Sequence, residues 1–535
     1  MRDAIIIGGG HNGLVAAAFL ARAGLKPLVL ERAERIGGCA ITTEIVPGFR
    51  CPTLAHRAAI DRFVIRALDL ERHGLEILRP AARLCAPTTE GRALVLWTDA
   101  AQAAREIASF SRGDAERYPG FLSSIAAVSG VLRSLITTLP PSIDHLSVAG
   151  VVDLLKTARK FRALGKADAY RLLRWLPMPA ADFTREWFQS EPLGSAIAAG
   201  GTLGSFLGPR SGGSAAVLLW LAAGEGQPIA PGWSARGGVG AVSEALASAA
   251  CQAGAEVRVG ADVRQIVVQD GAATGVVLAT GEVVTTRRVV SNADPRRTLL
   301  GLVDPVHLPP EFVRGVGNIR MRGTLAKINY AVSSLPQFAG AGGSSAGSKA
   351  ESDRPAAAAL SGWLRLCPGM DALERAFDAA KYGAYSDDPW IELAIPSILD
   401  PGLAPDGQHV VSAYVQFAPF SLRGTTWDRE RERLADVATA TIARYAPGFE
   451  HLVVARQIIT PMDLEATYGL TGGQIFHDKL ALDQLLSARP LLDWARYQTP
   501  IRNLFLCGAG AHPGSGLDGR AGMLAAKQII KAARK

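Results

Sequence analysis

The sequence predicts an α/β protein with a discontinuous Rossmann-type nucleotide-binding domain, into which a mixed α+β substrate domain is inserted. Two observations carry this prediction. An apolar strand at residues 4–7 is followed by a glycine turn and by an Ala-rich helix at 14–23. Strands, turns and helices of the same kind return near residue 237 and near residue 503. Because these pieces lie at the start, middle and end of the chain, the segments between them must form insertions.

The glycines of the first turn, Gly8, Gly10 and Gly13, fit the G-x-G-x-x-G fingerprint of dinucleotide binding. The first glycine permits a tight turn, the second lets a pyrophosphate approach the backbone, and the third lets the helix pack on the strand. A second strand at 26–30 ends at Glu31, 18 residues after Gly13 (31 − 13). A carboxylate near this spacing binds a ribose hydroxyl, and a surface role is the alternative for Glu31.

After Glu31 the chain continues through Arg32 and Arg35 to the doublet Gly37-Gly38. An arginine at this place can neutralise a pyrophosphate, and paired glycines let the chain run close beneath it. The stretch "ERAERIGGCAITTEIVPGF" resembles the Gly-Gly-doublet flavoproteins, a superfamily of amine oxidases, bacterial phytoene desaturases and retinol saturase. The cofactor implied by this resemblance is FAD.

A middle block, "GGVGAVSEALASAACQAGAEVRVGADVRQIVV" from Gly237, strengthens the resemblance. In the similar desaturases this segment returns to the FAD domain. The resemblance therefore implies that Val263 lies against the adenosine and that Asn292 lies near the end of the returning strand.

The last block, "NLFLCGAGAHPGSGLDGRAGMLAAKQII" from residue 503, resembles the flavin-closing motif of the same proteins. The resemblance implies that Gly508 and Gly510 pass the ribityl chain. It also implies that the backbone of Leu517, Asp518 and Gly519 points amides at the pyrimidine end of the isoalloxazine, where a helix N-terminus stabilises negative charge.

Three shorter stretches, "GGGHNGL", "GLTGGQIFHDKLALDQ" and "CGAGAHPGSG", are most similar to the phytoene desaturase-like group that includes pyridine nucleotide-disulphide oxidoreductase domain-containing protein two. One stretch departs from the desaturases. Where an Asp-x-Gly-Pro pattern is expected after the doublet, this chain has "CPTLAHRAAID". The resemblance therefore specifies the cofactor more closely than it specifies a polyene substrate.

The blocks predict five segments. Residues 1–75, 230–300 and 490–535 form the FAD-binding domain, and residues 76–229 form a mostly helical insertion that faces substrate or membrane. Residues 301–489 form the substrate domain, and the segment 339–357, which is poor in bulky residues, is predicted to be a mobile surface loop. We find no second dinucleotide fingerprint, so no separate site for NAD(P)H is expected.

Composition excludes several classes of protein. The net charge of +8 comes from 57 basic and 49 acidic residues, and aromatic residues make up only 7%, so we expect no nucleic-acid partner. Six dispersed cysteines show no CxxC pair and no metal-ligand spacing, which favours a reducing cytoplasm and predicts no metal site. No uninterrupted apolar run of about 18 residues is present, so we expect no spanning helix.

Basic residues concentrate in the helical segment 150–176, beside Leu and Trp175. The simpler interpretation is an amphipathic helix whose cations extend into solvent. The alternative is a peripheral membrane contact, on the inner face of a membrane, through which a lipid substrate enters. The resemblance adds weight to the alternative, because desaturases of this group draw their substrates from membranes.

Few side chains stand out as catalytic, which agrees with chemistry carried by a cofactor. His512 is predicted to lie nearest the isoalloxazine because it belongs to the flavin-closing turn, and bonding within that turn is its alternative role. His477 is predicted to face the substrate cavity, with a plain loop histidine as the alternative. His11, inside the fingerprint, is interpreted as a turn residue.

The sequence as a whole predicts an FAD-dependent oxidoreductase that acts on C–C bonds of a lipophilic, carotenoid- or isoprenoid-like substrate and passes electrons to oxygen, a quinone or another acceptor. Four hypotheses for the function stay open at this point: desaturase, flavin amine oxidase, flavin-dependent isomerase or saturase, and non-catalytic lipid escort protein. Paired aromatics upstream of the last block would favour an amine oxidase, and only Trp494 and Tyr497 are near it.

Overall fold

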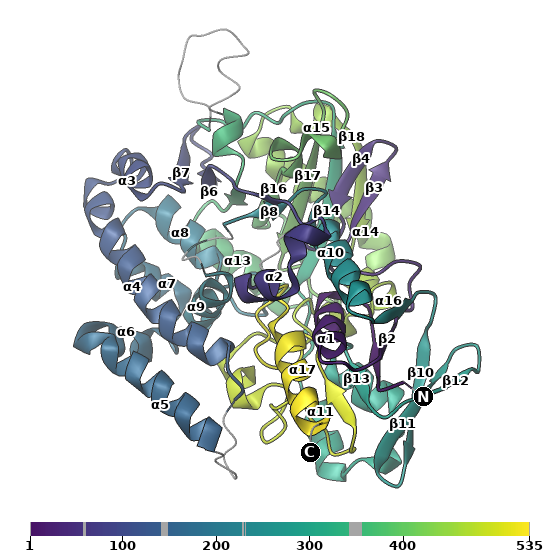
Figure 1. Cartoon of the computed structure of the whole chain (residues 1–535). Helices are drawn as coiled ribbons and strands as arrows, with labels where there is room; N and C mark the ends of the chain where they lie inside the picture. Colours follow the sequence, from purple (N-terminus) through teal and green to yellow (C-terminus); the bar gives the residue numbers. More distant parts are fainter. Residues whose placement is uncertain are drawn as a thin grey trace.

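The computed structural model describes residues 2–56, 60–140, 148–226, 229, 232–341 and 356–533. Most of the segment 339–357, predicted to be a mobile loop, lies outside the described residues. In the described part the chain forms two large sheets and a helical layer (Figure 1).

The first large sheet has five parallel strands in the order β19-β13-β1-β2-β9. Its strands come from three distant parts of the chain: β1 (Ala4–Ile7) and β2 (Pro27–Leu30), β9 (Glu256–Arg258) and β13 (Val289–Ser291), and β19 (Leu504–Leu506). All strands except the edge strand β9 are buried and apolar apart from Ser291, as a parallel sheet covered on both faces requires. The predicted α/β class with a discontinuous Rossmann-type domain is confirmed.

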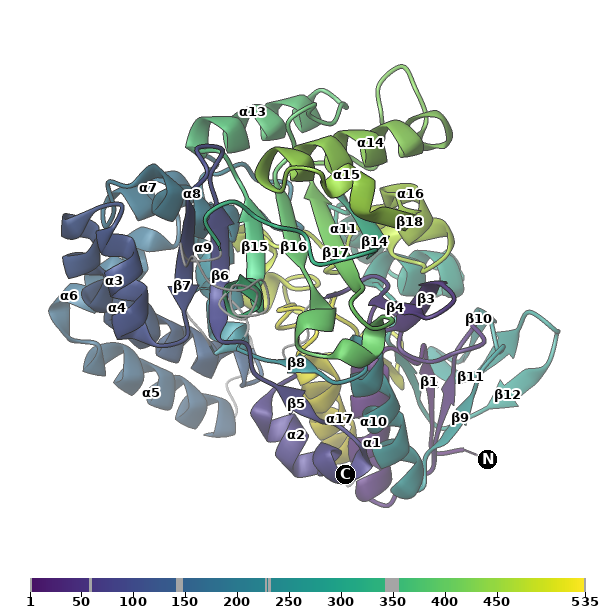
Figure 2. The same ribbon diagram turned by 90° about the horizontal axis from the view of Figure 1, so that it is seen from above.

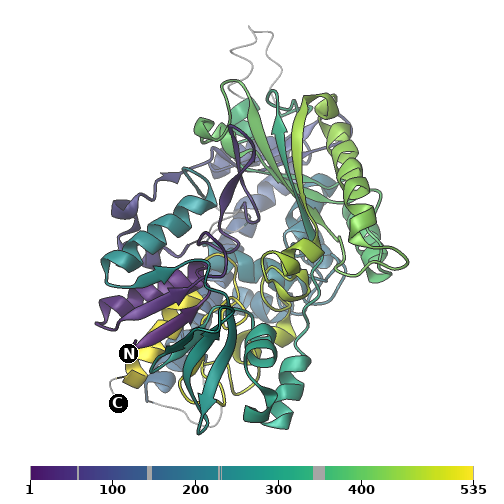
Figure 3. The same ribbon diagram turned by 90° about the vertical axis from the view of Figure 1, so that its right-hand side faces the viewer.

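Helices cover one face of this sheet and a small antiparallel sheet covers the other (Figure 2). The helices are α1 (His11–Arg22), α10 (Val239–Gln252) and α17 (Arg520–Ala533), and α1 packs against both of the others. The small sheet is β10 (Val263–Gln269), β11 (Ala272–Leu278) and β12 (Val283–Thr285). The N- and C-terminal parts of the chain therefore meet in one layer (Figure 3).

The second large sheet has the order β18-β14-β17-β16-β15-β6-β7, and only the β15–β6 pair is parallel. Its strands are β6 (Ala82–Pro87), β7 (Ala93–Trp97), β14 (Leu325–Val332), β15 (Trp363–Leu366), β16 (Ile391–Ala394), β17 (His409–Gln416) and β18 (Val453–Ile459). Residues 76–229 therefore contribute two strands to a sheet whose other five strands follow residue 300. Two helices, α13 (Met370–Lys381) and α14 (Trp427–Tyr445), lie along it (Figure 2).

The helical layer follows β7. It consists of α3 (Ala100–Ala108), α4 (Arg112–Ile136), α5 (Val148–Ala163), α6 (Gly165–Trp175), α7 (Ala180–Arg185), α8 (Glu191–Ala199) and α9 (Ser214–Glu225). Among the described residues α4 is long and apolar enough to cross a membrane, but 44% of its most apolar window is buried inside the protein. Core helices pass the same test, and α4 packs against α3 and α9.

Short elements complete the fold. They are β3 (Thr42–Val46) paired with β4 (Phe49–Pro52), β5 (Ile77–Leu78) paired with β8 (Ser234–Ala235), and the helices α2 (Arg62–Leu68), α11 (Pro310–Gly317), α15 (Phe449–Leu452) and α16 (Pro461–Ala466). The β5–β8 pair joins the start of the first insertion to the returning FAD segment.

Candidate functional site

A cavity opens where the carboxyl ends of β1, β2 and β13 face the seven-stranded sheet. In open α/β sheets ligands bind outside the carboxyl ends of the strands. One end of the cavity is lined by residues that directly follow these strands: Gly8 and Gly10 after β1, Glu31 and Arg32 after β2, and Asn292 after β13. We call this the nucleotide end.

The glycine turn fits a phosphate. Helix α1 begins after Gly10 without any side-chain cap and without an acidic residue in its first turn, so side chains leave its first N–H groups free to bind an anion. The Gly37-Gly38 doublet runs beside this turn, because Gly37 N donates to Gly9 O at 2.9 Å. A Cβ on Gly38 would lie 3.3 Å from Gly10 Cα, which shows how tightly the two glycine segments approach.

Glu31 is buried at the end of β2. Its Oε2 accepts a hydrogen bond from Gly9 N at 2.7 Å, and its Oε1 accepts one from Ala33 N at 2.9 Å. The carboxylate therefore fastens the glycine turn to β2 while it lines the nucleotide end. This burial is inconsistent with the alternative of a surface carboxylate.

Two arginines meet at the mouth of the nucleotide end. Arg32 and Arg297 both line the cavity, and a Cβ on Gly469 would lie 3.1 Å from Arg32 Nη2 and 3.2 Å from Arg297 Nη1. Partial burial lowers the pKa of Arg32, and the positive charge of Arg297 acts in the same direction. Two cations held this close are stabilised by an anion between or beside them, so Arg297, which the sequence prediction missed, is suited to bind an anion here.

The other end of the cavity is apolar and lies against the seven-stranded sheet. It is lined by Leu203, Leu221, Leu325, Ile475 and Phe476 together with Lys327 and Tyr414, and the carboxylate residue Glu225 also lines the cavity. Lys327 points from β14, a strand whose eight residues are all buried. Burial lowers the pKa of Lys327 to about 7, and the nearby Cys51 thiol opposes this shift. The amine is therefore partly neutral near neutral pH.

Two buried histidines line the cavity with unsatisfied ring nitrogens. His11 Nε2 and His477 Nδ1 have no hydrogen-bond partner in the described structure. Burial lowers the pKa of each ring to about 4. Neutral imidazoles with an unpaired nitrogen are suited to hydrogen bonds with a bound ligand. His477 therefore lies in the cavity lining, where the sequence analysis expects it.

Comparison with known proteins agrees with this geometry. The chain is 38% identical to the pyridine nucleotide-disulfide oxidoreductase domain-containing protein 2 of Rattus norvegicus, over 99% of this chain and 93% of that protein. The chain belongs to the family of that protein. It is also 26% identical to a lycopene-forming phytoene desaturase of Pseudescherichia vulneris, over 97% of this chain and 96% of the relative.

Two family profiles match as well. The NAD(P)-binding Rossmann-like domain matches residues 6–60, and the flavin containing amine oxidoreductase family matches residues 133–361. Putrescine oxidase bound to putrescine shares the fold, with a TM-score of 0.60 and 16% identity over 100% of this chain and 99% of that one. The protein is therefore a flavin-containing oxidoreductase of the amine oxidase and phytoene desaturase superfamily, and its cofactor is FAD.

The nucleotide end fits FAD. The uncapped helix, the two arginines and the glycine doublet suit the pyrophosphate, and Val263 and Asn292 line the cavity beside them. In the part of the chain that the structure describes, no group of three His, Cys, Asp or Glu side chains is arranged for a metal ion.

The structure places several predicted cofactor residues beside the cavity lining rather than in it. Gly13 lies inside α1, where a Cβ would meet Gly8 O at 2.2 Å, so it packs helix on strand. Gly37, the first glycine of the doublet, is buried and does not line the cavity. Gly508 and Gly510 pack against the chain after β13, where a Cβ would meet Asn292 O at 2.5 Å and Pro295 Cδ at 2.3 Å.

In the closing turn only Ala509 and residues 515–517 line the cavity, Leu517 among them. Asp518 instead accepts a hydrogen bond from Asp61 N at its main-chain oxygen, at 2.9 Å, and one from Arg520 N at its carboxylate, at 2.8 Å. Gly519 has φ +74° and allows the turn into α17. Asp518 and Gly519 therefore shape the turn and do not line the cavity.

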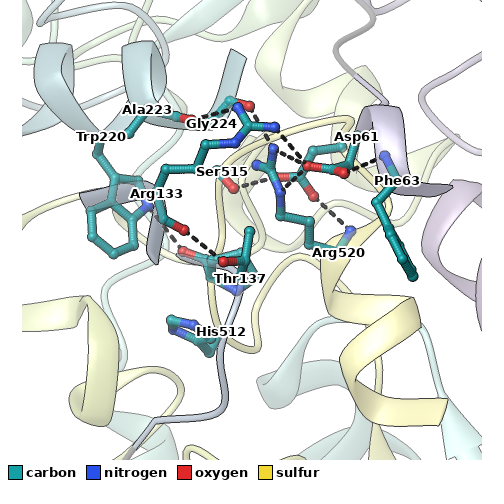
Figure 4. Close-up of polar contacts among 12 residues, drawn as sticks. Asp61, Phe63, Arg133, Thr137, Trp220, Ala223, Gly224, His512, Ser515 and Arg520 are labelled. Carbon is teal, nitrogen blue, oxygen red and sulfur yellow. Dashed lines mark hydrogen bonds and ion pairs between the residues drawn. The ribbon is translucent and has the colours of Figure 1, made fainter. Parts of the chain in front are cut away.

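Arg35 and His512 require correction. Arg35 is exposed and does not line the cavity, because the turn before the doublet points it outward. His512 is buried but faces α4, with its Nε2 3.1 Å from Leu135 O, while its main-chain oxygen accepts a hydrogen bond from Tyr497 Oη at 2.8 Å. The prediction that His512 lies nearest the flavin is not supported by this position (Figure 4).

A buried network holds the closing helix to the insertion (Figure 4). Arg520 Nη2 donates to Asp61 Oδ2 at 2.6 Å and to Gly224 O at 2.7 Å, and Arg520 Nη1 lies 3.0 Å from Asp518 Oδ2. Arg133 Nη2 from α4 reaches the same Asp61 oxygen at 3.1 Å. The network ties α17, α4 and α9 together behind the cavity.

Proposed function

We propose that the protein is an FAD-dependent dehydrogenase of C–C bonds in a lipophilic, isoprenoid-like substrate. The observation that carries the proposal is the apolar end of the cavity, which holds one titratable amine, Lys327, among leucines, Ile475 and Phe476. An apolar chain gains free energy on entering such a lining, whereas a substrate that carries charge loses hydration there.

The reaction needs two acceptors, one for a hydride and one for a proton. FAD held at the nucleotide end would supply the hydride acceptor. The protein binds and orients the chain in a dry cavity and accepts the proton from the neighbouring carbon. Lys327 is suited to hold this proton because burial lowers the pKa of its amine to about 7. His477, neutral and unpaired at Nδ1, is proposed to contact cofactor or substrate.

A flavin amine oxidase is the second candidate, since the amine oxidoreductase profile matches residues 133–361. Trp494 and Tyr497 do not supply the aromatic pair that such an enzyme would use, because neither lines the cavity. Trp494 packs against Phe312, with ring centroids 5.3 Å apart, and Tyr497 is buried. An isomerase or a saturase that acts on the same substrate class would need the same nucleotide end and the same apolar end of the cavity.

The test is an anaerobic absorption spectrum of the purified protein, before and after addition of phytoene or of a primary amine. Bleaching of the flavin by phytoene alone supports the proposal, and bleaching by the amine alone supports the amine oxidase. A flavin that stays oxidised while phytoene changes its double bonds indicates isomerisation. A folded protein that binds phytoene but contains no flavin would instead be a lipid escort protein. Reoxidation by oxygen or by a quinone then identifies the acceptor.

We further propose that α5 and α6 rest on the inner face of an anionic membrane. Leu155, Tyr170 and Leu173 are 64%, 66% and 62% exposed. Lys156, Arg159 and Lys160 line a groove between α5 and the end of α4. Exposed aliphatic and aromatic side chains beside clustered cations are the signature of an interfacial helix.

Vesicle flotation with and without phosphatidylglycerol tests this contact. Each basic residue near an anionic surface contributes about 1 kcal/mol, so reversing Lys156, Arg159 and Lys160 to Glu should weaken binding by ~10²-fold or more. The matched control reverses the charge of three exposed arginines on α3, α13 and α14 and should change vesicle binding little: Arg105, Arg375 and Arg429. Equal binding of both triple variants would refute the contact.

A further inference from the structure

A row of buried polar side chains leads from the cavity into the seven-stranded sheet. Lys327 Nζ donates to Asn329 Oδ1 at 2.6 Å and also to Ser412 Oγ. Lys327 pairs with Tyr414 across β14 and β17, and Asn329 pairs with Ser412, so all four side chains lie on one face of the sheet. Lys327 and Tyr414 line the cavity, and Ser412 lies directly behind them.

The row continues beyond Ser412 through His56. Ser412 Oγ lies 3.1 Å from His56 Nδ1, and His56 Nε2 lies 3.5 Å from Glu392 Oε1 on β16. Glu392 Oε2 accepts a hydrogen bond from Arg365 Nε at 3.0 Å, on the neighbouring strand β15. The side chains of His56, Glu392 and Arg365 are at most 1% exposed.

The His56 ring is held in this position by stacking. Its centroid lies 3.9 Å from that of Tyr414 and 5.0 Å from that of Trp363, and its main-chain N–H donates to Tyr414 Oη at 3.2 Å. A ring clamped between two aromatic residues keeps both nitrogens aimed at fixed partners. Nδ1 therefore lies at hydrogen-bond distance from the serine, and Nε2 lies at ion-pair distance from the carboxylate, whose charge favours a proton on Nε2.

The hydrogen bonds of Lys327 explain why such a row would be needed. Both of its acceptors are neutral oxygen atoms, and the structure gives it no ion pair among the described residues. A buried ammonium without a carboxylate partner is costly. The nearest negative charge in this row is Glu392, which is linked to Lys327 through His56 and Ser412. Cys51 from β4 and Tyr414 are the other titratable groups that face the amine.

We propose that Glu392, His56 and Ser412 are positioning residues that form a proton relay behind Lys327. The inference rests on the proposed function. The substrate hydride leaves with its electron pair for FAD, which is reduced. The neighbouring C–H bond breaks, its electron pair becomes the second bond of the new C=C, and its proton goes to the neutral Lys327 amine. Lys327 then passes a proton to Ser412 Oγ as Ser412 passes its own to His56 Nδ1, where Glu392 stabilises the imidazolium.

The decisive experiment measures the pKa of Lys327 itself, in the FAD-loaded protein without substrate. Protein labelled with ¹³Cε-lysine is titrated by NMR, and the Lys327 signal is the one missing from Lys327→Arg. Wild type is compared with Glu392→Gln and His56→Gln. The matched control is His409→Gln, a half-buried histidine on β17, the strand that also carries Ser412; His409 bonds a different serine, Ser397, at 2.9 Å.

The relay predicts that both Glu392→Gln and His56→Gln lower the pKa of Lys327 by more than about half a unit, whereas His409→Gln leaves it unchanged. An unchanged Lys327 titration in folded His56→Gln would overturn the relay. His56→Gln keeps the Arg365–Glu392 ion pair, so it decides the question even if Glu392→Gln does not fold. A protein whose flavin no apolar substrate reduces contradicts the proposed function, and the NMR titration still reports on the relay.

Discussion

Replacing Gly10 by Ala separates cofactor binding from folding. Gly10 has φ −72° and ψ 167°, a conformation open to every residue. The added methyl group would lie 2.8 Å from Asn292 Nδ2 and 4.0 Å from Gly37 O. The close neighbour is a side-chain amide that can move, so the apoprotein should unfold at nearly the wild-type temperature.

The cofactor should be lost because the methyl group stands where a pyrophosphate must approach the backbone. Loss of two charge-assisted hydrogen bonds from the turn, at about 1.5 to 3 kcal/mol each, amounts to about 3 to 6 kcal/mol. This corresponds to a ~10²- to 10⁴-fold rise in the Kd for FAD. The assay is the visible absorption of the purified protein, followed by titration of apoprotein with FAD.

Two further glycines serve as controls. Gly113→Ala, at an exposed position of α4 with no atom within 4 Å of the new Cβ, should retain FAD. Gly13→Ala should lose both the fold and the cofactor, because its Cβ would meet the fixed main-chain oxygen of Gly8 at 2.2 Å. If Gly10→Ala binds FAD as wild type does, the glycine turn does not hold the pyrophosphate.

Three other substitutions test the site and its support. Glu31→Ala leaves the N–H groups of Gly9 and Ala33 without their carboxylate, so the Kd for FAD should rise about tenfold while the fold is kept, as titration would show. Asp61→Asn should cost about 3 to 5 kcal/mol of unfolding free energy. Burial is the largest single effect on the pKa of Asp61 and raises it, but Arg520, the Phe63 N–H and Arg133 together bring the net pKa below its usual value. This contribution is therefore present above about pH 4 and is lost as pH falls further, and denaturant melts across pH should show the gap closing. His512→Ala should lower stability by about 1 kcal/mol without altering the rate of flavin reduction.

The nucleotide end could be predicted from the sequence because its signals are local. The glycine spacing, the strand before it and the carboxylate at the end of the next strand all lie within residues 4–31. Each constrains its own neighbourhood, and Gly8, Gly10 and Glu31, which the sequence predicts to bind the cofactor, line the cavity.

Residues that reach the cavity through long-range pairing could not be predicted. Lys327 approaches it only because β14 pairs with β17, some ninety positions later in the chain, and His56 joins them from the other side. A single lysine inside the apolar stretch "LAKINYAV" was the available signal. His512 was misplaced for a related reason, since sequence proximity to the closing turn does not determine which way a side chain points.

The C-terminal origin of β19 and α17 has a consequence for biosynthesis. The FAD sheet takes its edge strand from residues 504–506, and α1 packs against α17, which is translated hundreds of residues later. During translation the glycine turn is therefore complete hundreds of residues before the layer that covers it. FAD can be retained only after β19 and α17 have left the ribosome, so a chain truncated before β19 should emerge without flavin and with α1 uncovered, a substrate for chaperones and proteases.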